Sequence, residues 1–198
     1  MRQTALLMML LLGLSGAAFS ASGVELGVKM GQVMSYSQNS LQVGANDISR
    51  QTLVGGQLYI SSIPVVDLIA SVDYSWHDKN FSFAADNLPF RMRDLAVTMS
   101  AVLPVQLSSL CFYFGGGVGS HSISYAYNRP VSLSLSANGI MIPEASTYFG
   151  YHGIVGVKGM PPHMLVGFFA EGRLTRIDAM GAQIKYTTFS AGLYLPLP

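Results

Sequence analysis

The sequence contains few charged residues and only one cysteine. Aspartate, glutamate, lysine and arginine make up 11% of the chain, whereas about 25% is usual in soluble domains. A single cysteine, Cys111, cannot form an internal disulfide, and its strand-like surroundings indicate a small apolar residue rather than a reactive thiol. The formal net charge is only +1, so the charge balance gives no support for nucleic acid as a partner.

Long apolar runs are scarce as well. The run from Ala5 to Leu14 follows Arg2 and is shorter than the roughly 20 residues that a membrane-spanning helix needs. Ala18 and Ser20 have the small-residue spacing of a signal-peptide cleavage site. Residues 1–20 are therefore predicted to be a cleaved secretory signal peptide, and residues 21–198 a single exported domain. Because the chain is nevertheless 50% hydrophobic, it is either a soluble protein with unusually few charged residues or a membrane β-barrel.

The most informative segment covers residues 66–78. Its even positions from 66 to 76 are apolar or aromatic, and its odd positions are polar except for Ile69. A period of two is typical of a β-strand, because successive side chains point to opposite faces. One wholly apolar face beside a face that carries Asp67 and Asp73 suits a strand with lipid on one side and a wet lumen on the other.

Seven further segments have this alternation, and their connections alternate in length. The segments are 24–36, 52–62, 94–103, 110–122, 148–158, 164–176 and 185–195. Short turns marked by Pro64, Pro104 and Pro161–Pro162 alternate with longer connections at 37–51, 78–93 and 123–147, and a shorter one at 178–183. Short periplasmic turns and longer extracellular loops are typical of outer-membrane barrels. The sequence thus predicts an all-β fold, an eight-stranded antiparallel up-and-down transmembrane β-barrel.

Glycine usage fits a narrow barrel. Gly115, Gly116, Gly117 and Gly119 all lie inside the predicted strand 110–122. The lumen of an eight-stranded barrel is only just wide enough for side chains. We therefore expect these glycines to relieve crowding on the inner face.

The pattern resembles that of the OmpA/OmpX/OmpW-type group of eight-stranded outer-membrane barrels. The residues that carry the resemblance are the aromatic and glycine-rich segments 112–119 and 149–157 and the final strand 189–195. The resemblance covers residues 21–198 and implies a location in the outer membrane of a diderm bacterium. It does not imply one activity, because this fold supports several unrelated functions.

The predicted inner face carries charges of both signs. They are Lys29, Asp73, Glu171 and Arg173, with His152 nearby. Charges in a narrow lumen must pair, because an isolated buried ion is very costly. We expect a structural network that fills the lumen; the alternative is a narrow gated pore for small solutes past the same charges. On the outer face, Tyr36, Tyr74 and Trp76 are predicted to form an aromatic girdle at the membrane interface.

An enzyme that modifies lipid A is a second alternative, because some eight-stranded barrels carry a His-x-Ser dyad. Here the residue two positions after His121 is Ile123, and Ser122 is expected on the opposite strand face. No carboxylate is expected to face His121. His77, His121, His152 and His163 have no metal-ligand spacing. We therefore predict a non-catalytic protein without a metal site or cofactor.

The predicted partners are outer-membrane lipid and lipopolysaccharide. The connection 123–147 is the candidate extracellular contact surface, because it is long and contains the apolar stretch 140–143. The remaining structural alternative is a soluble lipocalin-like binding barrel. That fold needs an apolar interior and a charged exterior, the reverse of the pattern here. The oligomeric state does not follow from the sequence.

Overall fold

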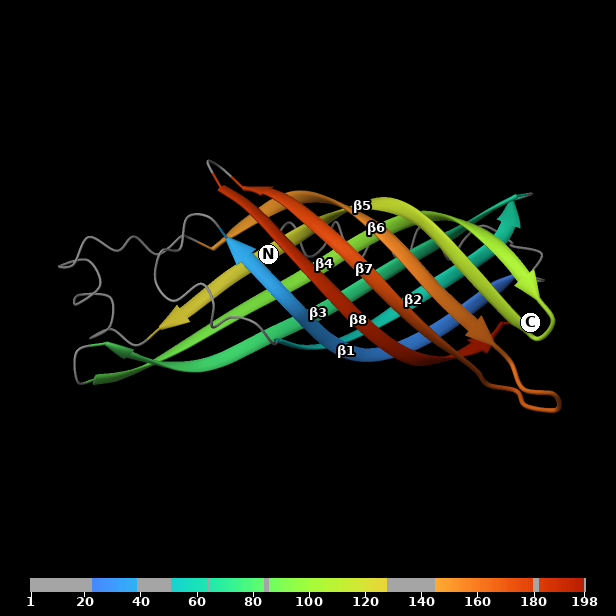
Figure 1. Cartoon of the computed structure of the whole chain (residues 1–198), viewed down its shortest axis with the longest axis horizontal. Helices are drawn as coiled ribbons and strands as arrows, with labels where there is room; N and C mark the ends of the chain where they lie inside the picture. Colours follow the sequence, from blue (N-terminus) through green and yellow to red (C-terminus); the bar gives the residue numbers. More distant parts are fainter. Residues whose placement is uncertain are drawn as a thin grey trace.

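The fold is a closed barrel of eight antiparallel strands, each paired with its neighbours in the chain. The computed structural model describes residues 23–38, 51–63, 65–83, 86–127, 145–179 and 182–197. β8 pairs with β1 and closes the barrel (Figure 1), so the predicted fold class is confirmed. In the described residues, helices that are long and apolar enough to cross a membrane are absent. The strands are β1 (Val24–Gln38), β2 (Gln51–Ile63), β3 (Val66–Phe83), β4 (Asp86–Leu107), β5 (Leu110–Tyr127), β6 (Ser146–Gly159), β7 (Gly167–Ala179) and β8 (Ala182–Pro196).

The outer wall of the barrel is apolar. Large hydrophobic side chains are exposed on it around the whole circumference, for example Met30 (69% exposed), Phe149 (64%) and Leu174 (67%). The alternate residues of the same strands point inward and are buried, as Lys29, His152 and Arg173 are. The faces predicted for residues 66–78 are confirmed as far as Trp76, since the polar positions are buried and the apolar positions are partly or fully exposed, Ile69 excepted. A wall with its hydrophobic side outward suits an apolar solvent.

Several strands are longer than the alternation predicts. The predicted loop 78–93 is instead a continuation of the β3–β4 hairpin, which stays paired as far as Phe83 and Asp86. β5 also continues to Tyr127, opposite Phe90. These extensions were missed because a strand beyond the lipid layer needs no continuous apolar face. The predicted contact loop 123–147 is therefore partly strand: residues 123–127 belong to β5 and residues 146–147 to β6, while 128–144 lie outside the described residues.

The short turns gather at one end of the barrel, as predicted, together with the start of β1 and the end of β8 (Figure 1). Each contains a residue with positive φ: Val65 (79°), Ser108 (57°) and His163 (67°). The placement of Pro104 in a turn was wrong, since it lies within β4 opposite Tyr113. The described pairs between β3 and β4 end at Val102. Pro104 thus lies past that ladder, where a missing N–H group costs little.

Glycines allow close packing inside the barrel at selected positions. A Cβ atom on Gly117 would overlap the carbonyl oxygen of Met99 and approach within 2.7 Å of His152 Nε2. Gly115 and Gly119 share the inner face with Gly117. Gly116 faces outward and is exposed, so the expectation of an inner position was wrong for this residue.

Two apolar clusters lie inside the barrel, one on each side of its middle. Tyr59, Ile69, Val102, Tyr113 and Ile154 form the cluster nearer the short turns. A second cluster lies nearer the long connections and contains Val33, Met92, Ile123, Ile177, Ile184 and Tyr186. The lumen is therefore packed as predicted, but it is not polar throughout. Ile69, the exception in the alternation of residues 66–78, has 0% exposure and belongs to the first cluster.

Candidate functional site

A network of four charged side chains lies between the two apolar clusters. Lys29 of β1 donates to Glu171 Oε1 of β7 at 2.7 Å, and its Nζ atom lies 3.1 Å from Asp73 Oδ1 of β3. Arg173 of β7 reaches Asp73 Oδ2 at 3.2 Å and Glu171 Oε1 at 3.3 Å. The structure thus brings together four of the five lumen residues singled out in the sequence. The four carry two positive and two negative charges, so the network is neutral.

Neutral side chains add hydrogen bonds to this network, although Asp73 Oδ1 and Arg173 Nε have no hydrogen-bond partner among the described residues. Arg173 also donates to Thr98 Oγ1 at 2.9 Å and to Ser71 Oγ at 3.4 Å. Tyr113 and Ser190 each donate to Glu171 at 3.4 Å. All four charged side chains are at most 8% exposed. Buried charges need this kind of pairing, because their loss of hydration is otherwise not offset.

His152 does not join the four charges. Its Nε2 atom lies 2.7 Å from Ser100 Oγ, and it has no ion pair in the described part of the chain. Thr175 is opposite His152, whereas Arg173 is opposite Ile154, two residues further along β6.

A second polar group, formed by His121, Asp94 and Tyr186, lies nearer the long connections. His121 Nδ1 is 3.2 Å from Asp94 Oδ2 and 3.1 Å from the Tyr186 hydroxyl, which also donates to Asp94 at 3.3 Å. The expectation that no carboxylate faces His121 was therefore wrong. Asp94 and Ala96 share the inner face of β4, and Ala96 is opposite His121. The diagonal pair could have been found by aligning the inward positions of the two strands.

Among the described residues, the neighbours of His121 along β5 offer no hydroxyl on the inner face. Ser122 is exposed on the outer face, as predicted, and Ile123 is buried beside His121. His121 contacts Asp94 and Tyr186 through Nδ1, and its Nε2 atom has no hydrogen-bond partner in the described part of the chain. The adjoining cavity measures about 20 Å³. That is room for about one water molecule and not for an acyl substrate.

A third polar group closes the end of the lumen that holds the short turns. Lys158 Nζ forms two contacts of 2.9 Å with the carboxylate of Glu25 and lies 3.4 Å from the centre of the Tyr59 ring. Tyr59 in turn donates to Asp67 at 2.6 Å. This group combines an ion pair with a cation–π contact, which strengthens where water is excluded. Within the described ranges, no cluster of histidine, cysteine and carboxylate side chains is arranged to hold a metal ion.

The predicted girdle residues are only partly described. Tyr74 and Trp76 lie on the outer face of β3 and stack with ring centroids 5.6 Å apart. Trp76 is opposite Thr52 and Arg93, near the start of the hairpin extension. The backbone of Tyr36 pairs with Tyr186 after a register shift between Val33 and Ser35. The side chain of Tyr36 lies outside the described part of the structure.

The apolar outer wall and the filled lumen define a class of protein, the small eight-stranded up-and-down barrels. Two solved outer-membrane barrels have the same fold. Neisserial surface protein A (NspA) is 14% identical, with a TM-score of 0.56 over 89% of this chain and 98% of its own. Ail, the attachment invasion locus protein of Yersinia pestis, was solved in complex with the heparin analogue sucrose octasulfate; it is 13% identical, with a TM-score of 0.51 over 87% and 99%. No family description and no curated protein matches the sequence itself.

Proposed function

We propose that this chain is a small outer-membrane barrel with a closed lumen and a structural or surface-interaction role rather than a catalytic one. The observation that carries the proposal is the orientation of the wall. Bulky apolar residues such as Val28 and Phe114 are exposed outside, and the buried charges are inside. A soluble lipocalin-like barrel needs the opposite arrangement, because its outer face contacts water.

Membrane location is tested by fractionating cells that produce the full chain. We expect recovery with the outer membrane, extraction only by detergent, and faster gel migration of the unheated protein, because a folded barrel stays compact in mild detergent. Recovery from the soluble periplasm would contradict the proposal. The same preparation shows by N-terminal sequencing whether residues 1–20 are removed, as we propose.

The filled lumen supports a closed barrel over the alternative of a gated pore. Two apolar clusters flank the charge network, and the cavity beside His121 holds about one water molecule. A hydrated ion therefore has no free route along the described part of the lumen. In planar bilayers we expect no steady conductance from the purified barrel. Reproducible single-channel steps that scale with the protein concentration would support the pore instead.

A surface role is supported by the hairpin extension, which we define as residues 77–83 of β3 and 86–92 of β4. These residues pair with each other beyond the last described pair between β2 and β3, Thr52 with Trp76. The extension lies at the end opposite the short turns, together with the end of β5 and the start of β6, which the connection 128–144 joins in the sequence. In the proposed orientation this end of the barrel faces the outside of the cell. The complex of Ail with a sulfated sugar gives a first ligand class to test.

The test compares the binding of intact cells to immobilised heparin. One strain produces the full chain, and a second produces a chain in which a short Gly-Ser linker replaces residues 128–144. We expect the linker variant to bind less while it keeps the heat-dependent gel shift of a folded barrel. Equal binding by both strains and by cells without the protein would exclude this ligand class.

A further inference from the structure

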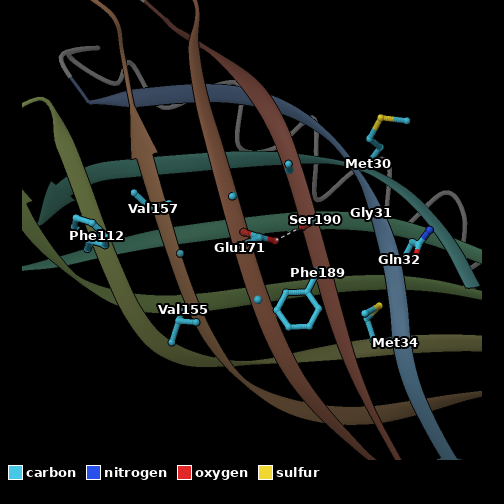
Figure 2. A pocket seen from close by; sticks show the side chains of 14 residues that line it. Met30, Gly31, Gln32, Met34, Phe112, Val155, Val157, Glu171, Phe189 and Ser190 are labelled. Carbon is cyan, nitrogen blue, oxygen red and sulfur yellow. Dashed lines mark hydrogen bonds between the residues drawn. The ribbon is translucent and has the colours of Figure 1, made fainter. Parts of the chain in front are cut away.

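A groove of about 690 Å³ runs along the outer wall over β6, β7, β8 and β1. The small residues Ala170, Gly172 and Ala191 line it together with larger side chains, among them Phe112, Val155, Phe189 and Met34 (Figure 2). Ala170 is opposite Ala191, and Gly172 is opposite Phe189. The groove therefore follows the β7–β8 pair and is lined almost entirely by apolar atoms.

Two cations lie on the same pair of strands, nearer the long connections. Arg176 of β7 is opposite Lys185 of β8, and both share the outer face with Gly172. Arg176 lies four positions after Gly172, a distance of about 13 Å along a strand. Arg176 also lies 5.8 Å above the Tyr151 ring. Asp178 is the described carboxylate nearby. Its Oδ1 atom is 3.9 Å from Arg176 Nε, and the side chains of Arg176 and Asp178 are 42% and 68% exposed.

We infer that the groove and the cation pair form one site for a phosphorylated acyl lipid of the outer leaflet. The inference rests on the proposed function, because only a barrel in a membrane exposes this wall to lipid. In the proposed orientation, Arg176 and Lys185 lie at the level of the outer headgroups and bind the anionic group. One acyl chain of the same molecule lies in the groove below, against Ala170 and Ala191.

Charge and position favour a lipid over a second copy of the chain. A second barrel would bring its own Arg176 and Lys185 toward the same rim, and like charges repel. A free anion would bind the two cations but has no apolar part to contact the groove. The opposite wall offers a comparison. There the outer positions of β3 and β4 carry bulky residues such as Val72, Leu95 and Met99, with Arg93 above them.

The site is tested by native mass spectrometry of the full mature barrel in a neutral detergent. The probes are a bis-phosphorylated hexa-acyl glucosamine disaccharide, the same lipid without phosphates, and inorganic phosphate. We expect the phosphorylated lipid to bind at least tenfold more tightly than the dephosphorylated one. Charge-assisted hydrogen bonds are strong enough for a loss of about tenfold for each of Arg176→Ala and Lys185→Ala. Arg93→Ala, on the opposite wall, is the matched control and keeps wild-type binding.

Filling the groove separates the acyl contact from the charge contact. Ala191→Leu should weaken the binding of both lipids severalfold. Ala101→Leu, an equivalent outward change on β4, should leave the binding of both lipids unchanged. The inference is overturned if the Arg93 or Ala101 control loses as much lipid binding as the variants of the proposed site. It is also overturned if inorganic phosphate competes with the lipid and binds as tightly as the lipid does. A barrel that fractionates with the outer membrane but does not prefer the phosphorylated lipid also overturns it, while the proposed function stands.

Discussion

Replacing Arg173 with methionine tests whether the lumen charges act as one network. The side chain makes contacts with Asp73, Glu171, Thr98 and Ser71, three of them with other strands. Methionine has a similar length and no charge. The variant leaves Lys29 between two carboxylates, so one negative charge in the lumen loses its partner.

The size of the effect follows from burial. Arg173 is 5% exposed, and its two carboxylate partners are 8% and 2% exposed. Removing one partner of a buried ion pair costs about 3–5 kcal/mol, because the remaining charge stays desolvated. Removing a complete pair is less harmful, since Lys29 and Glu171 still neutralise each other at 2.7 Å. Asp73→Asn combined with Arg173→Met should therefore cost about 1–3 kcal/mol less than the sum of the single changes.

The free energies come from urea titrations of the barrel in lipid vesicles, followed by fluorescence. Trp76 is the chain's single tryptophan and lies outside the network, so it reports unfolding in every variant. Arg93→Met removes an exposed outward cation and serves as the control, with an expected change below about 0.5 kcal/mol. Two results refute the reasoning: a cost for Arg173→Met as small as that of the control, or single costs that simply add in the double variant.

Two further changes test other layers of the lumen. Gly117→Ala should prevent folding or destabilise the barrel by about 1–3 kcal/mol through overpacking, because the added Cβ atom would overlap the Met99 carbonyl oxygen. The control is Gly153→Ala, whose added Cβ atom would have its nearest neighbour 4.0 Å away. This variant should fold normally, as the heat-dependent gel shift will show. Lys158→Met should lower the urea midpoint, since Glu25 loses its partner, and Lys158→Arg should restore most of the loss; equal midpoints for both would argue against an ion-pair role.

The strand pattern could be predicted because the lipid contact imposes it residue by residue. Every outward position from Leu26 to Met30 must be apolar, and so must those on the other strands, which makes a period of two visible in the sequence. The same logic located Lys29, Asp73, Glu171 and Arg173 on the inner face. It could not give their partners, because pairing depends on the relative register of β1, β3 and β7. One residue more or less in a turn would shift that register.

Features outside the lipid contact were harder to predict. The outward apolar alternation of β3 ends at Trp76, so it does not mark the paired residues of the hairpin extension beyond it. The group of Asp94, His121 and Tyr186 spans β4, β5 and β8, and its members lie far apart in the sequence. Ile69 and Ile154 occupy inner positions that a purely polar lumen would exclude, because the pattern separates the two faces but does not say how the inner one is filled.

The order of layers inside the barrel explains how four buried charges are accommodated. An apolar cluster around Ile69 and another around Ile177 separate the charge network from both ends. Water is thereby kept from the ion pairs, which strengthens their attraction but raises the cost of any unpaired charge. A neutral, fully paired set is the arrangement that tolerates such isolation, and Lys29, Asp73, Glu171 and Arg173 form one. These contacts link β1, β3 and β7, so a shift in the register of any of the three strands would leave a charge unpaired. The apolar wall alone would allow several registers, and the charge network selects one of them.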